Sequence, residues 1–205
     1  MKNANPVSRA VGRGVAAGVL LVGLTACGQA QPDQAGPGGK TTGGSVPTDK
    51  AAFRPGVSHW FEIAMGNRPV EMQLAITLPE MQRGLMERRE LGAEQGMLFI
   101  FARPQRMRFW MRNTPTPLDI GFFDQSGVLR EVYPLHPYDE TPVGSVREDL
   151  QFALEMNQGW FARSGVRVGQ RLDLVAVAAA VRERGFPLQG FLGLSEAAES
   201  AAAAR

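Results

Sequence analysis

Residues 96–120 read GMLFIFARPQRMRFWMRNTPTPLDI and carry the clearest strand pattern of the chain. Residues 96–101 are almost entirely apolar, which predicts a central strand that is buried on both faces. Residues 106–112 alternate with a period of two, which predicts a second strand with one buried side, formed by Met107, Phe109 and Met111. This stretch therefore predicts a β fold organised around its first strand.

The same reasoning predicts short strands on both sides of this stretch. Period-two patterns or short apolar runs occur at 60–65, 70–76, 118–123, 128–133, 150–156 and 171–175. One short helix should begin at Thr77, because Thr77 and Glu80 have capping-box spacing and Pro79 is tolerated in a first turn. About eight short strands and one short helix predict a mainly β domain, a compact barrel or sandwich.

The N-terminus has the organisation of an export signal. Basic residues precede an apolar run at residues 15–25, which is too short for an ordinary membrane-spanning helix and suits a signal peptide. The run ends in Leu24-Thr25-Ala26-Cys27, which resembles the lipobox of bacterial lipoproteins, and Cys27 is the single cysteine of the chain. We therefore expect a lipid anchor at Cys27 and a location in the cell envelope, on the outer face of the plasma membrane or on the outer membrane.

Composition then divides the chain into four parts. Residues 1–26 form the expected signal peptide, and residues 27–55 are a Gly/Pro-rich linker that we expect to be disordered. The β domain should occupy residues 56–176, and residues 177–205 form an Ala-rich C-terminal tail, frayed at its end.

Charge and cysteine usage exclude several classes of function. The chain has a net charge of +2, but residues 57–174 contain thirteen arginines, no lysine and fifteen acidic residues. A nucleic-acid partner is not expected, because a phosphate-binding surface needs a net positive face. A single cysteine permits no intramolecular disulfide, and neither His59 nor His136 has a second ligand at zinc-site spacing. We expect no metal and no cofactor.

Several short motifs resemble one known family. In order along the chain they are Arg83-Gly84-Leu85-Met86, Gly96-Met97-Leu98-Phe99, Phe109-Trp110-Met111-Arg112-Asn113-Thr114, Pro117-Leu118-Asp119-Ile120, and Leu154-Glu155 with Gly159. They resemble the family called domain of unknown function 192, over roughly residues 61–175. The resemblance implies a small mixed-strand β-barrel or sandwich with a short helix, in proteins that are often exported, and it implies no activity. Arg112 departs from the family pattern, which more often has lysine there.

Polar residues around the proline-rich loop form the first candidate site. Arg112, Asn113, Thr114 and Asp119 surround two prolines, and Arg83 of the expected helix could join them. Polar groups on a rigid scaffold suit a small polar ligand. The structural alternative is that Asn113 and Thr114 cap turns and that Asp119 is paired, with Arg83 or Arg112 as the candidate partner.

Two further candidates depend on how the strands pack. Asp119 and Glu155 could act together as acid and base on an envelope glycan, provided that the strands bring them close. The exposed side of residues 106–112 places Trp110 among arginines, which could bind an acidic polymer, a phosphorylated headgroup or the sugar ring of a cell-wall glycan. The structural alternative is that Trp110 packs under the helix and the arginines extend into solvent. The methionines are expected to fill the core.

These observations lead to three hypotheses about function. The first is a non-catalytic, lipid-anchored envelope module that binds a small polar ligand or a partner through Arg83, Trp110, Arg112, Asn113, Thr114, Asp119 and Glu155. The second is an envelope glycan hydrolase that uses Asp119 or Glu155. The third is a structural protein that docks on another envelope protein and has no small-molecule site.

Overall fold

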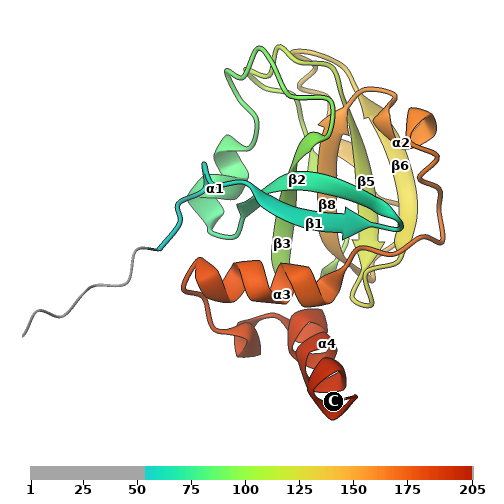
Figure 1. Ribbon diagram of the computed structural model, residues 1–205. Helices are drawn as coiled ribbons and strands as arrows, with labels where there is room; N and C mark the ends of the chain where they lie inside the picture. The colour runs from blue at the N-terminus through green and yellow to red at the C-terminus, as the bar shows by residue number, and fades with distance from the viewer. Residues whose placement is uncertain (1–53, 205) are drawn as a thin grey trace, which may run out of the picture. The chain divides into compact units, whose positions relative to one another are not determined.

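The structure is a computed structural model that describes residues 54–204. Six strands form one mixed sheet in the order β1-β2-β3-β8-β5-β6 (Figure 1). They are β1 (Phe61–Met65), β2 (Arg68–Ala75), β3 (Gln95–Gln105), β5 (Leu118–Asp124), β6 (Leu129–Leu135) and β8 (Leu150–Asn157). A separate ribbon pairs β4 (Arg108–Phe109) with β7 (Val143–Gly144). The predicted mainly β class is confirmed.

Four helices and one 3-10 turn complete the described chain. They are α1 (Leu78–Arg83), α2 (Trp160–Arg163), α3 (Leu174–Glu183), η1 (Leu188–Gly190) and α4 (Leu192–Ala203). Figure 1 shows α3 and α4 together at one end of the sheet, with α1 beside β2. No helix within residues 54–204 is long and apolar enough to cross a membrane.

The sheet is not closed into a barrel, because β1 and β6 remain its two edges. The segment that follows α2 connects these edges at one end. Gly66 donates its N–H to the Arg171 carbonyl at 2.8 Å, and Leu172 donates to the Gly127 carbonyl at 2.8 Å. The expected strand at 171–175 is replaced by this connection and by α3, whose first turn is capped by the Asp173 carboxylate.

Three other expectations differ from the structure. Strand β3 continues through Pro104 instead of turning there, and residues 106–112 form a strand only at β4. Their alternation is nevertheless kept, since Met107 and Met111 are buried while Trp110 and Arg112 are exposed. The segment after Gly185, expected to end frayed, forms η1 and α4, and Leu194 is fully buried.

The two faces of the sheet carry two separate hydrophobic cores, as expected for strands whose side chains alternate. One core joins the sheet to α2, α3 and α4 and includes Leu154, Met156, Trp160, Val177 and Leu194. The other lies beneath α1 and the β4–β7 ribbon and includes Leu85, Phe99, Met107, Ile120 and Ala153. The second core is the one that opens to solvent at the candidate site.

The expected signal peptide at residues 1–26, its Cys27 and nearly all of the linker at 27–55 lie outside the described residues.

Candidate functional site

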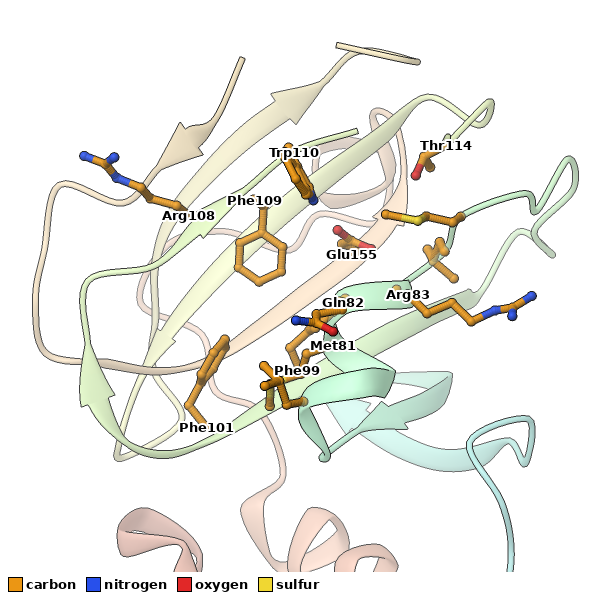
Figure 2. A pocket seen from close by; sticks show the side chains of 14 residues that line it. Met81, Gln82, Arg83, Phe99, Phe101, Arg108, Phe109, Trp110, Thr114 and Glu155 are labelled. Atoms are coloured by element: carbon orange, nitrogen blue, oxygen red, sulfur yellow. The ribbon is translucent and has the colours of Figure 1, made fainter. Parts of the chain in front are cut away.

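A cleft of about 240 Å³ opens between α1 and the β4 segment (Figure 2). Helix α1 supplies one wall through Leu78, Met81, Gln82 and Arg83, and Phe99 and Phe101 of β3 form its base. The opposite wall consists of Arg108, Phe109 and Trp110. Aromatic and aliphatic surface with a few polar groups is the ordinary composition of a small-molecule site, and this one is small.

Glu155 is the acidic side chain of the cleft. Alternation along β8 points Phe152, Leu154 and Met156 into the core beneath α3, so Glu155 projects from the other face of the sheet. Its exposed fraction is 5%, and Figure 2 shows its carboxyl group inside the cleft. Among residues 54–204, no group donates a hydrogen bond to this carboxyl and no cation pairs with it. Burial alone therefore raises the pKa of Glu155 to about 8.

Local structure defines both ends of helix α1. The Glu80 carboxylate accepts hydrogen bonds at 2.9 Å from the N–H groups of Ile76 and Thr77, which caps the first turn. At the other end, Gly84 adopts a positive φ of 47°, and a Cβ there would lie 3.3 Å from the Phe99 ring. Glycine thus lets the chain leave the helix directly above the base of the cleft.

Arg184, beyond the end of α3, ties α1 to the rest of the domain. Its guanidinium donates to the Leu74 carbonyl at 2.7 Å and pairs with Glu80, and Arg184 itself is buried. Burial raises the pKa of Glu80, but the hydrogen bonds from Thr77, Ile76 and Arg184 outweigh it and hold the pKa below its ordinary value. One wall of the cleft is therefore anchored by a residue more than a hundred positions later in the chain.

The exposed rim of the cleft carries apolar and cationic side chains on both walls. Trp110 is 46% exposed and Leu78 is 67% exposed, although both line the cleft. The Arg112 guanidinium lies 5.8 Å from the centre of the Trp110 ring, within range of a cation–π contact. Figure 2 shows the guanidinium groups of Arg83 and Arg108 extending away from Glu155. Arg83 pairs with Glu87 at 3.6 Å.

The proline-rich loop is divided between the cleft and a neighbouring surface. Thr114 is buried and lines the cleft, where its hydroxyl donates to the Arg112 carbonyl at 3.1 Å. Asn113 is exposed in the left-handed region with φ 52°, beside Pro115 and Tyr138. The loop therefore contributes Thr114 to the cleft, while Asn113 adopts the turn conformation that asparagine tolerates.

Asp119 lies away from the cleft. In the register of β5 and β8, Ile120 is opposite Glu155 and Asp119 is opposite Met156, so the two carboxyls project from opposite faces of the sheet. Asp119 accepts the Gly159 N–H at 2.7 Å, instead of pairing with Arg83 or Arg112. Burial raises the pKa of Asp119, and the Gly159 bond and the charge of Arg163 reduce that rise.

The structure thus brings together Arg83, Trp110, Thr114 and Glu155, with Arg112 stacked on Trp110, and leaves Asn113 and Asp119 elsewhere. The apolar walls, formed by Leu78, Met81, Phe99, Phe101 and Phe109, and the anchor Arg184 were not expected from the sequence. Leu78 and Met81 have helical spacing, but this spacing is equally typical of core residues. Within residues 54–204, no three potential metal-ligating side chains are grouped.

Comparison with known proteins gives a family and a fold. The family model DUF192, "Uncharacterized ACR", matches residues 61–174. A solved structure of a protein of unknown function from Novosphingobium aromaticivorans DSM 12444 is 34% identical, with a TM-score of 0.54 over 63% of this chain and 99% of that one. A protein from Sinorhizobium meliloti 1021, provisionally described as a transcription regulator, is 32% identical, with a TM-score of 0.51 over 55% of this chain and 90% of that one.

No curated protein matches the chain. The matched region begins at β1 and ends at the first residue of α3, so it contains every residue that lines the cleft. The resemblance expected from the sequence motifs is confirmed over nearly the same residues, and the chain belongs to the DUF192 family.

Proposed function

We propose that this protein is a small-molecule-binding module whose ligand enters the cleft between α1 and β4. An apolar part of the ligand would pack among Leu78, Phe99, Phe109 and Trp110, and its polar head would meet Glu155. The observation that carries the proposal is the Glu155 carboxyl, buried, facing a cleft and without a partner among residues 54–204. An unpaired buried polar group is costly, so its presence at an open cleft favours a partner supplied from outside.

A binding role is favoured over glycan hydrolysis. Glycoside hydrolases that use two carboxyl groups place both beside the same bond, within roughly 10 Å of each other. Here Asp119 projects from the opposite face of the sheet, and the lining of the cleft contains one carboxyl group. The raised pKa of Glu155 would suit a general acid, but the described residues of the cleft offer no second carboxylate to act with it.

The cleft also favours a ligand site over a docking surface alone. A purely structural partner surface would be a broad apolar patch. The exposed apolar residues Leu78 and Trp110 instead flank a concave site.

The ligand experiment uses the full-length protein and a panel of small alcohols, amides, amines and acids that each carry an aliphatic or aromatic group. Binding is followed by NMR at the indole N–H signals and by thermal shift. We expect Trp110→Ala and Glu155→Gln each to weaken binding by about tenfold, the value of one lost buried contact. Tyr138→Ala and Glu62→Gln are matched controls, because both residues are exposed outside the cleft. Equal binding by all four variants would place the ligand elsewhere.

We also propose that the module is exported and held at the envelope by a lipid on Cys27, with a cell-envelope molecule as its ligand or partner. The support is the order of basic residues, apolar run and Leu24-Thr25-Ala26-Cys27 in the sequence. Metabolic labelling with a fatty acid should mark the wild-type protein and not Cys27→Ala. Labelling that persists in the variant would refute the anchor.

A further inference from the structure

We infer that the group bound at Glu155 is an organic ammonium ion, an inference that rests on the proposed function. Its basis is the pairing of one carboxyl group, without a counter-charge among the described residues, with a cleft lined by aromatic rings. The ligand would bring the missing positive charge to Glu155 and place its alkyl substituents against those rings.

The lining of the cleft offers Glu155 no counter-charge. The charged side chains that line the same cleft are Arg83 on α1 and Arg108 on β4, and both guanidinium groups extend away from the base (Figure 2). Arg83 already pairs with Glu87. Neither arginine lowers the pKa of Glu155, for which burial is the sole cause of the shift. The carboxyl group therefore has no cation of its own, and a buried carboxyl group needs one in order to ionise.

The walls of the cleft supply aromatic rings, which suit a cation. Phe99, Phe101, Phe109 and Trp110 line the cleft, and Phe99 and Phe109 lie edge to face with ring centres 4.9 Å apart. The faces of aromatic rings attract cations, and an aromatic cage is the usual way to bind alkylated ammonium groups. Figure 2 shows Phe109 and Trp110 beside the Glu155 carboxyl. A neutral apolar ligand would use the rings and leave the carboxyl unpaired, whereas an ammonium ion uses both.

The ionisation of Glu155 makes the binding of an ammonium ion depend on pH. In the empty cleft Glu155 is mostly protonated at neutral pH, because its pKa lies at about 8. An ammonium ion favours the ionised form, so its binding should release a proton and should strengthen as the pH rises toward 8. A neutral hydrogen-bond acceptor would show the opposite dependence, because it requires the protonated carboxyl.

The test compares choline with neohexyl alcohol, its uncharged carbon isostere, on the full-length protein. Choline keeps its charge at every pH, so its pH profile reports on the protein alone. We expect choline to bind at least tenfold more tightly than the alcohol at pH 8.5, with an affinity that rises up to about tenfold per pH unit between about pH 6 and pH 8. Glu155→Gln should remove both the preference and the pH dependence, while Glu62→Gln should keep them.

Equal or tighter binding of neohexyl alcohol would overturn the ammonium class and leave the cleft as a binding site for neutral ligands. Absence of choline binding would also overturn the inference, whereas the proposed function itself fails only if no member of the wider panel binds in the cleft. A choline affinity that Glu155→Gln does not change would place the cation elsewhere.

Discussion

Four partly or fully buried carboxyl groups of this domain form a series that ends at the cleft. Asp124 accepts four hydrogen bonds, two of them from Ser126 and the others from Val128 and Arg130. Glu80 accepts three and Asp119 accepts one, whereas Glu155 accepts none from residues 54–204. The pKa is lowered in Asp124 and Glu80 and raised in Asp119 and Glu155, so burial prevails where partners are few.

This series separates structural carboxyl groups from one that is available for binding. Asp124 organises the β5–β6 turn and Glu80 anchors α1, and each bond that they accept offsets the cost of burial. Glu155 bears the same cost without compensation, in the one position of the series that faces the cleft. Natural domains tolerate such a group where a ligand completes it.

The largest expected effect is the pH dependence of stability that Glu155 imposes. Its carboxyl ionises near 4.5 in the unfolded chain and near 8 in the folded protein, so the folded state binds the extra proton between these values. The contribution of Glu155 to the free energy of unfolding should therefore be greatest below its unfolded pKa and fall by roughly 1.4 kcal/mol per pH unit between about pH 5 and pH 8. Urea unfolding of wild type and Glu155→Gln across this range measures the difference. A difference that stays constant with pH would contradict the assignment, and Glu62→Gln serves as the control.

Replacing Arg184 should leave the Glu80 carboxyl group without its cation, as Glu155 is in the wild-type protein. Arg184→Met removes the guanidinium from a buried pair and should destabilise the protein by about 3 kcal/mol, because Glu80 and the Leu74 carbonyl lose a partner. The pKa of Glu80 should rise, and NMR titration of its carboxyl carbon would detect the change. Arg182→Met is the matched control, because Arg182 is exposed in the last turn of α3, two residues before Arg184. Unchanged unfolding of Arg184→Met would show that α1 is held by other contacts.

Removing the most satisfied carboxyl should cost stability without affecting the cleft. Asp124→Ala should destabilise the protein by about 2 kcal/mol at pH 7, since its bonds organise the turn and the Arg130 partner is partly exposed. The stabilisation by Asp124 is present above its unfolded pKa and is lost as the pH falls through its lowered folded pKa. Asp124→Asn retains an acceptor and should lose less. Weaker ligand binding in these variants would show that Asp124 is not purely structural.

Asp119 should show the smallest effect. Asp119→Ala removes a single hydrogen bond to Gly159 and should cost about 1 kcal/mol, with no change in the affinity of any cleft ligand. Thermal unfolding measures the change in stability, and ligand titration followed by NMR at the indole N–H signals measures the affinity. Loss of affinity without loss of stability would restore Asp119 as a site residue.

The fold was largely predictable because period-two patterns report which side of a strand is buried. Seven of the eight strands, the helix that begins at Leu78 and the central position of β3 follow from such local signals, whereas the short strand β7 was not expected. The strand expected at 171–175 was wrong because Arg171 and Leu172 form isolated bridges, and a capping aspartate then starts a helix. The alanine-rich end looked frayed because its burial depends on contacts of α3 and α4 that local patterns do not report.

The site was only partly predictable from the sequence. Trp110, Thr114 and Glu155 could be nominated from their residue types, but their convergence depends on strand register. Register also separates Asp119 from Glu155, and no pattern in either strand reveals on which face its neighbour's residues lie. The anchor Arg184 could not be found, because it meets Glu80 across a separation of 104 residues.

The anchor Arg184 also affects where the domain could be truncated. The family match stops at residue 174, and a chain cut there would keep every side chain that lines the cleft. It would lose the guanidinium that binds Glu80 and the Leu74 carbonyl, together with Val177, Val181 and Leu194 of the core beneath the sheet. The region that the family model matches therefore lacks contacts that hold one wall of its own cleft. A substitution at Arg184 could shift α1, and with it the shape of the site, without any change in the residues that line it.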